Sequence, residues 1–226
     1  MTSLLSSQCA KVIAIDGPSA SGKGTIAERI ATLLNRDYLD SGALYRLTAL
    51  YAQQSQIDWT NETQIAHLAS TLPANFIAGK ILLNNQDVTV DIRNESIGMG
   101  ASKIAAFPAV RMALLQRQRD FLTEKGLVAD GRDMASVVFP NAELKIFLTA
   151  SAQVRAKRRA LQLGLPVNGV QFQQILTDIE KRDVADQSRV VAPLKPVAEA
   201  HILDTSFLNI QESVQKILDW YRIIEK

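Results

Sequence analysis

One stretch near the start of the chain decides its fold: Gly17-Pro18-Ser19-Ala20-Ser21-Gly22-Lys23-Gly24-Thr25. The apolar, β-branched run at 11–16 predicts a buried strand, and residues 26–34 are apolar at helical spacing. Glycines let the backbone approach a polyanion, the N-terminus of the following helix adds partial positive charge, and Lys23 adds an ammonium group. Strand, glycine-rich loop and helix together predict a loop that binds the phosphates of a nucleoside triphosphate.

The loop departs in one place from the commonest form of its signature. The spacing from Gly17 to Lys23 fits G-x-x-x-x-G-K, but Gly24 follows where most such loops have a magnesium-binding hydroxyl, and Thr25 brings the hydroxyl one residue later. Direct metal ligation by Thr25 is therefore one candidate role. The sequence G-K-G-T resembles the nucleoside monophosphate kinases. A glycine-rich turn without a ligand is the alternative, against which the lysine and both flanking elements count.

Composition narrows the class of protein. The chain has 226 residues, of which 47% are hydrophobic and 21% charged, enough for one substantial core and a small insert. The net charge of +2 argues against nucleic acid as a partner. Because no apolar run reaches the roughly 18 residues of a membrane span and residues 1–10 do not resemble a secretion signal, we expect a cytoplasmic protein without a membrane partner. Cys9 is the only cysteine, so no internal disulfide is expected.

Strand and helix patterns alternate along the rest of the chain. Further short apolar runs that end in polar residues lie at 38–40, 127–130, 144–148 and 201–204. Helical patterns lie near 42–55, 108–125, 151–163, 170–187 and 209–222. This alternation predicts an α/β fold, a doubly wound parallel sheet of about five strands flanked by helices. Ligands of such sheets gather at the carboxyl ends of the strands, where Asp16, Asp40 and Asp130 stand.

One region breaks the alternation. Residues 74–90 are rich in β-formers and are interrupted by Gly79-Lys80 and Asn84-Asn85, both typical of hairpin turns. The pattern predicts a small antiparallel insert, a place where a movable cover over an acceptor site could be attached.

The segment Asp40-Ser41-Gly42-Ala43-Leu44-Tyr45-Arg46 follows a strand and opens a helix. Taken alone, Ser41 could be an N-cap and Arg46 a solvated helix residue. Together with the glycine-rich loop, Asp130-Gly131-Arg132-Asp133 and Ala192-Pro193-Leu194, however, the motif D-S-G-x-x-Y-R resembles the bacterial cytidylate kinases from Val12 to about Leu203.

This resemblance implies a P-loop fold that transfers the γ-phosphoryl group of ATP, with Mg²⁺ as cofactor, to CMP or dCMP in pyrimidine nucleotide metabolism. It implies a single domain, and we expect a monomer. The implied parts are a core at about 10–60, 105–150 and 190–226, a nucleoside-monophosphate-binding insert at about 61–104 and a lid at about 151–189.

Residues after the run at 127–130 are implied to serve both substrates. Asp130 would hold magnesium through water, with capping of the next turn as the alternative. By resemblance, Arg132 reaches the acceptor phosphate and Asp133 accepts from the exocyclic amine of cytosine, where uracil offers a carbonyl instead. Ser102 and Arg111 resemble the residues that help to read the cytosine ring. An exposed arginine beside Asp133 or Glu124 is the alternative for Arg111.

Two basic clusters complete the implied site. Arg155, Arg158 and Arg159 share one face of a helix, which is either a solvated basic face or the lid over the phosphates. Arg182, Asp186 and Arg189 form either a surface ladder of ion pairs or, by resemblance, the contacts to ribose and acceptor phosphate. The implied catalytic residues are Lys23, Arg132, Arg155, Arg159 and Arg182. The implied CMP-binding residues are Ser41, Arg46, Ser102, Arg111, Arg132, Asp133, Arg182, Asp186 and Arg189.

Two rival functions stay open on the sequence. A nucleotide-dependent switch would use the same loop, although the chain has neither an N-K-x-D nor a D-x-x-G segment. A small-metabolite kinase of the same fold would phosphorylate an alcohol other than a nucleotide.

Overall fold

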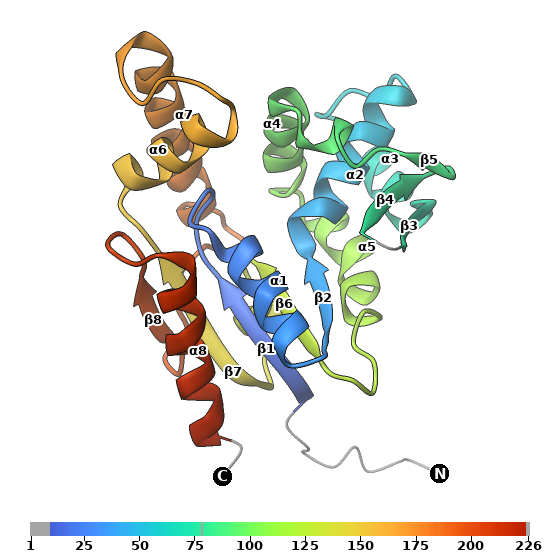
Figure 1. Ribbon diagram of the computed structural model, residues 1–226. Helices are drawn as coiled ribbons and strands as arrows, with labels where there is room; N and C mark the ends of the chain where they lie inside the picture. Colours follow the sequence, from blue (N-terminus) through green and yellow to red (C-terminus); the bar gives the residue numbers. More distant parts are fainter. Residues whose placement is uncertain (1–9, 78, 225–226) are drawn as a thin grey trace, which may run out of the picture. The chain divides into compact units, whose positions relative to one another are not determined.

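The computed structural model describes residues 10–77 and 79–224 (Figure 1), so Cys9 lies outside the described residues. The chain forms two compact units, one made of the segments up to Leu39 and from Phe121 onward, the other of Asp40–Asp120. The second unit is longer at both ends than the insert expected at 61–104. The expected lid at 151–189 falls within the first unit.

The first unit contains a five-stranded sheet in the order β2-β6-β1-β7-β8. These strands are β2 (Asp37–Asp40), β6 (Leu127–Gly131), β1 (Ala10–Asp16), β7 (Ala142–Thr149) and β8 (His201–Asp204). Strand β1 pairs in parallel with both β6 and β7, and β7 pairs in parallel with β8. The predicted α/β architecture is confirmed.

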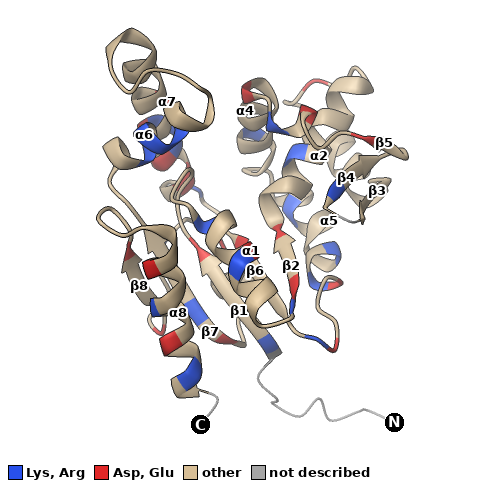
Figure 2. Ribbon diagram, in the orientation of Figure 1, with Lys and Arg blue, Asp and Glu red and all other residues tan. Residues whose placement is uncertain are grey.

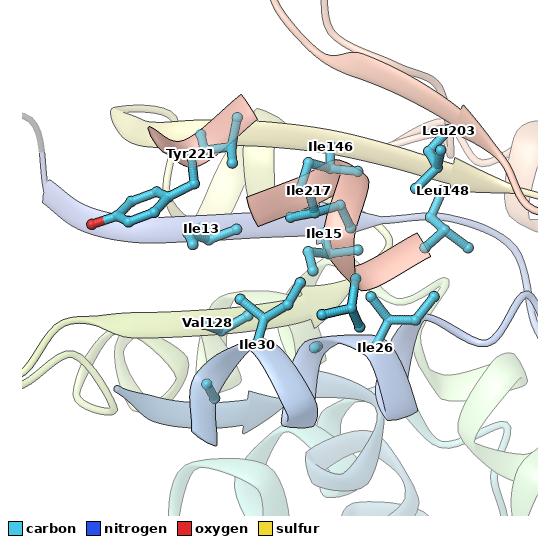
Figure 3. Packing of buried hydrophobic residues seen from close by; sticks show 14 residues of the cluster. Ile13, Ile15, Ile26, Ile30, Val128, Ile146, Leu148, Leu203, Ile217 and Tyr221 are labelled. Atoms are coloured by element: carbon cyan, nitrogen blue, oxygen red, sulfur yellow. The ribbon is translucent and has the colours of Figure 1, made fainter. Parts of the chain in front are cut away.

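The core lies on both faces of this sheet. Residues Val12–Ile15 of β1 are wholly buried, as expected for a central strand of a parallel sheet. Figure 3 shows Ile26 and Ile30 of α1 (Lys23–Leu33) and Ile217 of α8 (Ile210–Ile224) converging on the side chains of β1 and β7. Burial of these branched side chains fixes the strand that leads into the glycine-rich loop.

Three further helical segments of this unit position the site. They are the short π-helical turn η2 (Met134–Val138) and the helices α6 (Ala152–Gln162) and α7 (Gly169–Gln187). The predictions of helices at 151–163 and 170–187 are confirmed to within one residue. None of the described helices is long and apolar enough to cross a membrane.

The second unit is helical with one small sheet. Its elements are α2 (Ser41–Gln54), α3 (Glu62–Ser70), β3 (Ala74–Ile77), β4 (Lys80–Leu83), β5 (Gln86–Asp87), the 3₁₀ turn η1 (Asp91–Arg93), α4 (Glu95–Ile104) and α5 (Pro108–Arg119). The predicted antiparallel insert is confirmed as the sheet β3-β4-β5. Asn84 and Asn85 both have positive φ, 49° and 64°, as a tight hairpin turn requires.

Sequence patterns misplaced or missed three helices of the second unit. The prediction of a helix at 108–125 is wrong beyond Arg119, because Asp120 is the C-cap and a turn follows, in which Gly126 (φ +86°) leads the chain into β6. Helices α3 and α4 were not predicted. Asn61, whose side chain accepts from the Gln64 N–H at 3.1 Å, was the available signal for α3.

Candidate active site

The glycine-rich loop follows β1 and runs close to β7. A Cβ built on Gly17 would lie 2.0 Å from the Leu148 carbonyl oxygen, so only glycine fits there. Gly22 (φ +92°) caps α1, and the Lys23 ammonium donates to the Pro18 carbonyl at 3.2 Å, across the loop. The Lys23 ammonium therefore lies against the glycine-rich loop, where its charge adds to the partial positive charge of the helix N-terminus.

Two hydroxyls of the loop are buried without a hydrogen-bond partner within the described residues. They are the Oγ atoms of Ser19 and Ser21. Buried polar atoms are nearly always satisfied in proteins, and an unsatisfied one costs about 1–3 kcal/mol. Hydroxyls of this kind in a loop preceding a helix fit an anion with several acceptor oxygens.

The first turn of α1 meets a carboxylate from β6. A Cβ on Gly24 would lie 3.3 Å from Asp130 Oδ2, so the carboxylate lies close to the backbone at this position. Asp130 is buried (4% exposed) at the end of β6. Thr25 is exposed and lines a pocket of about 670 Å³ with residues of α8. The Asp130 carboxylate therefore lies beside Gly24 of the loop, whereas Thr25, the last residue of the loop, lines the pocket with α8.

Asp186 of α7 joins two arginines from different parts of the first unit. Its carboxylate accepts from Arg132 Nε at 2.8 Å and from Arg189, and it is 1% exposed. Burial alone would raise the pKa of Asp186, but the charges of Arg132, Arg189 and Arg182 hold that pKa below its ordinary value. The interpretation of a surface ladder is therefore wrong for Asp186.

Basic residues lie along α6 (Figure 2), and two of them contact the glycine-rich loop. The Arg155 guanidinium is buried; it donates to the Ser19 carbonyl at 3.2 Å and makes a bidentate pair with Asp183 of α7. Arg158 donates to the Ser21 carbonyl at 2.9 Å and to the Thr205 carbonyl at 2.6 Å. Burial lowers the pKa of Arg158. The solvated-face interpretation is wrong for Arg155 and Arg158.

Arg159 and Arg182 are partly buried and stand on α6 and α7. Sequence reasoning missed Asp183, and it named Arg158 only as a member of the basic face. No spacing rule connects Arg155 to an aspartate 28 residues away on another helix, so only the packing of α6 on α7 reveals the pair.

Asp16 is a second residue whose role sequence patterns did not reveal. It is the last residue of β1, 4% exposed, and its two carboxylate oxygens accept from the N–H groups of Met134 (2.8 Å) and Ala135 (2.9 Å). Burial raises the pKa of Asp16 to about 7 against the opposing effect of these two hydrogen bonds; the charge of Asp133 raises it further and that of Arg132 lowers it.

The second unit carries the other predicted residues. Asp40, not Ser41, is the N-cap of α2: its side chain accepts from the Ala43 N–H at 3.0 Å, so the N-cap interpretation of Ser41 is wrong. Ser41 is nevertheless buried. Arg46 is partly buried and donates to the Ile92 carbonyl at 3.1 Å, rather than being a solvated helix residue.

Arg111 and Ser102 stand on neighbouring helices of the same unit. Arg111 is buried in the first turn of α5 and donates to the Ala105 carbonyl at 3.2 Å. The interpretation of Arg111 as an exposed arginine is therefore wrong. Ser102 is partly buried near the end of α4. A buried cation near a helix N-terminus, where the dipole disfavours it, marks an unusual position.

The parallel sheet, the glycine-rich loop at the end of its central strand, and the arginines that hold the loop define a P-loop nucleotide-binding protein. Comparison with known proteins narrows this class. The family model described as cytidylate kinase matches residues 13–223.

Curated relatives agree over nearly the whole chain. The cytidylate kinase of Neisseria gonorrhoeae is 64% identical over 94% of this chain and 97% of its own length. The cytidylate kinases of Chromobacterium violaceum and Pseudomonas fluorescens are each 54% identical, over 93% and 92% of this chain and 95% and 94% of their own lengths. The chain belongs to the cytidylate kinase family.

Proposed function

We propose that this chain transfers the γ-phosphoryl group of ATP to CMP, and to dCMP, giving CDP or dCDP and ADP. Membership of the cytidylate kinase family supports the reaction. The observation that carries the site is the position of Arg132 and Asp133, directly after β6, the strand that neighbours the one leading into the glycine-rich loop. Donor loop and acceptor residues thus stem from adjacent strand ends.

On the donor side, residues 17–25 bind the triphosphate. The unsatisfied hydroxyls of Ser19 and Ser21 and the N-terminus of α1 supply donors to phosphate oxygens, and the Lys23 ammonium moves from the Pro18 carbonyl to the transferred group. Arg155, whose charge Asp183 balances, and Arg159 of the same helix supply guanidinium donors to the phosphates. Because Arg155 is already bound to the loop through Ser19, it orders that loop as well.

Magnesium neutralises charge on the β- and γ-phosphates when it is bound. The residues present fit such an ion, because Asp130 places a carboxylate against the first turn of α1. The described residues contain no cluster of three or more metal-ligating side chains, in keeping with an ion held chiefly by substrate phosphates and water. Asp130 through water, with Thr25, would hold it.

On the acceptor side, Arg132, Arg182 and Arg189 bind the phosphate of CMP, and Asp186 accepts from the sugar hydroxyls. The contacts of Asp186 with Arg132 and Arg189 hold two guanidinium groups together, with a net charge of +1 for the three side chains, which suits a dianionic phosphate. The second unit contributes Ser41, Arg46, Ser102 and Arg111 to CMP.

The reaction needs no covalent intermediate and no general base with an unusual pKa. Phosphoryl transfer has a loose, highly charged transition state, so alignment of the two nucleotides and the cations Lys23, Arg132 and Arg182 supply the catalysis. Exclusion of water by the segment 151–189 suppresses hydrolysis of ATP. We further propose that the protein acts as a monomer in the cytoplasm.

The base-recognition role of Asp133 gives the sharpest test. A coupled assay of kcat/KM for CMP, dCMP, UMP and AMP should rank CMP and dCMP far above UMP. Asp133→Asn offers an amide that can donate as well as accept, so the CMP-to-UMP ratio of kcat/KM should fall about tenfold or more. Asp178→Asn, at an exposed position on α7, is the control and should leave the ratio unchanged.

Equal rates with CMP and UMP in the wild-type enzyme would refute the substrate assignment. An unaltered ratio in Asp133→Asn would refute only the role of Asp133. Steady ATP hydrolysis without any acceptor would favour a nucleotide switch instead.

A further inference from the structure

The carboxylate of Asp16 ties the strand before the glycine-rich loop to the residues after Asp133. Asp16 stands opposite Gly131 in the parallel pairing of β1 with β6, and its side chain reaches past the end of β6 to the N–H groups of Met134 and Ala135. Each carboxylate oxygen accepts one N–H. Because Asp16 is 4% exposed and both oxygens are occupied, it is placed to orient protein groups rather than to touch a substrate.

The two N–H groups belong to the start of η2, whose N-cap is Asp133. An aspartate in that position normally accepts from the first N–H groups of its own helix, but the side chain of Asp133 makes no such bond here. Asp16 supplies the capping oxygens from the neighbouring strand instead. The turn also closes on the Asp133 carbonyl, which accepts from the Val137 N–H at 2.9 Å.

We propose that Asp16 is a positioning residue: by accepting from the N–H groups of Met134 and Ala135, it fixes the backbone that carries Arg132 and Asp133. This inference rests on the proposed role of Asp133 in reading cytosine. It makes the strand that leads into the ATP loop a determinant of acceptor choice.

The local chemistry supports an oriented carboxylate. Burial raises the pKa of Asp16 to about 7, whereas the two N–H groups favour the charged form and lower that pKa, as hydrogen bonds to an oriented carboxylate do. A neutral amide in its place has one acceptor oxygen and an NH₂ group that would face a second N–H donor. One N–H of η2 would then be left without a partner in a buried position.

The test is Asp16→Asn, with Asp204→Asn as its matched control. Asp204 also ends a strand of the same sheet and accepts a backbone N–H, that of Ser206 at 2.8 Å, but it is exposed and remote in sequence from η2. In Asp16→Asn we expect KM for CMP to rise about tenfold and the CMP-to-UMP ratio of kcat/KM to fall several-fold. KM for ATP should change less than threefold, and Asp204→Asn should keep the wild-type ratio.

The outcomes separate a positioning role from a merely structural one. Loss of folded protein alone would lower kcat for every acceptor equally, without moving KM or the ratio. A folded Asp16→Asn variant with the wild-type KM for CMP and the wild-type ratio would overturn the inference, while the proposed function would stand. A wild-type enzyme without preference for CMP would instead refute the function on which the inference rests.

A second variant and a measurement on the unaltered enzyme guard against misfolding. Asp16→Ser keeps one acceptor in a small neutral side chain and is expected to shift the ratio in the same direction. In wild-type protein, hydrogen exchange at the amides of Met134 and Ala135 should be slow, because both are bonded to Asp16. Fast exchange at these two amides would overturn the inference whichever variant folds.

Discussion

At the scale of single residues, the path of the glycine-rich loop depends on Gly17, which has no side chain. A Cβ at position 17 would lie 2.0 Å from the Leu148 carbonyl oxygen, in β7 beside the core. Neither the strand nor the loop can move aside without disturbing the sheet. We therefore expect Gly17→Ala to weaken ATP binding at least a hundredfold and to lower the free energy of unfolding by several kcal/mol.

Gly164 serves as a control position, because the same substitution by alanine there meets no steric obstacle. A Cβ on Gly164 would meet nothing within 4 Å, although its φ of +66° makes alanine strained there. Gly164→Ala should therefore cost only about 1–2 kcal/mol and leave ATP affinity near the wild-type value. Calorimetric titration with ATP and urea denaturation compare the two variants; equal behaviour would contradict the steric argument.

At the scale of elements, α6 and α7 are joined by the buried pair of Arg155 and Asp183. Asp183→Asn leaves the Arg155 charge buried without its counterion, so the free energy of unfolding should fall by about 3–5 kcal/mol. Asp219→Asn removes the exposed partner of Arg222 and should cost under about 1 kcal/mol. Similar losses in the two variants, measured by denaturation, would show that the Arg155 pair is not held out of water.

Helices and strands with clear hydrophobic periodicity or a sequence motif were predictable. Those whose formation depends on tertiary packing were not. The strand before Gly17 and the helix after it followed from apolar patterning. Helix α4 was missed because Gly98 and Gly100 lower its propensity. The structure explains Gly100: a Cβ there would lie 2.6 Å from the ring of Trp59, so packing requires the residue that hides the helix.

The residues of the candidate site were likewise predictable only where their chemistry lies in consecutive residues. The loop at 17–25 and the sequence of Arg132-Asp133 were visible because consecutive residues carry their chemistry. The bonds of Asp16 to η2 and of Arg158 to the loop were not, because they join residues more than a hundred positions apart in sequence. Local patterns carry no record of such partners, which only the parallel pairing of strands brings together.

At the scale of the whole molecule, Asp16 links stability to pH. Its pKa is about 7 in the folded chain against an ordinary value of 3.8, so between these values the folded state holds a proton that the unfolded state has lost. The contribution of Asp16 to stability should be fully present below about pH 4 and be lost as pH rises through 7, by at most about 4 kcal/mol. Urea denaturation of wild type and Asp16→Asn at pH 5 and pH 8 measures the effect, and an identical pH dependence would contradict it.

Strand β1 has consequences for how the chain matures on the ribosome. Val12 pairs with Leu127 of β6 and Ile13 with Leu144 of β7, which are synthesised 115 and 131 residues later, so the nascent segment Val12–Ile15 emerges before either neighbour. At bacterial translation rates this lasts of the order of ten seconds. During that interval four consecutive apolar residues are accessible to holdase chaperones. Nucleotide binding cannot yet assist folding, because the strand that precedes the glycine-rich loop has not been incorporated into the sheet.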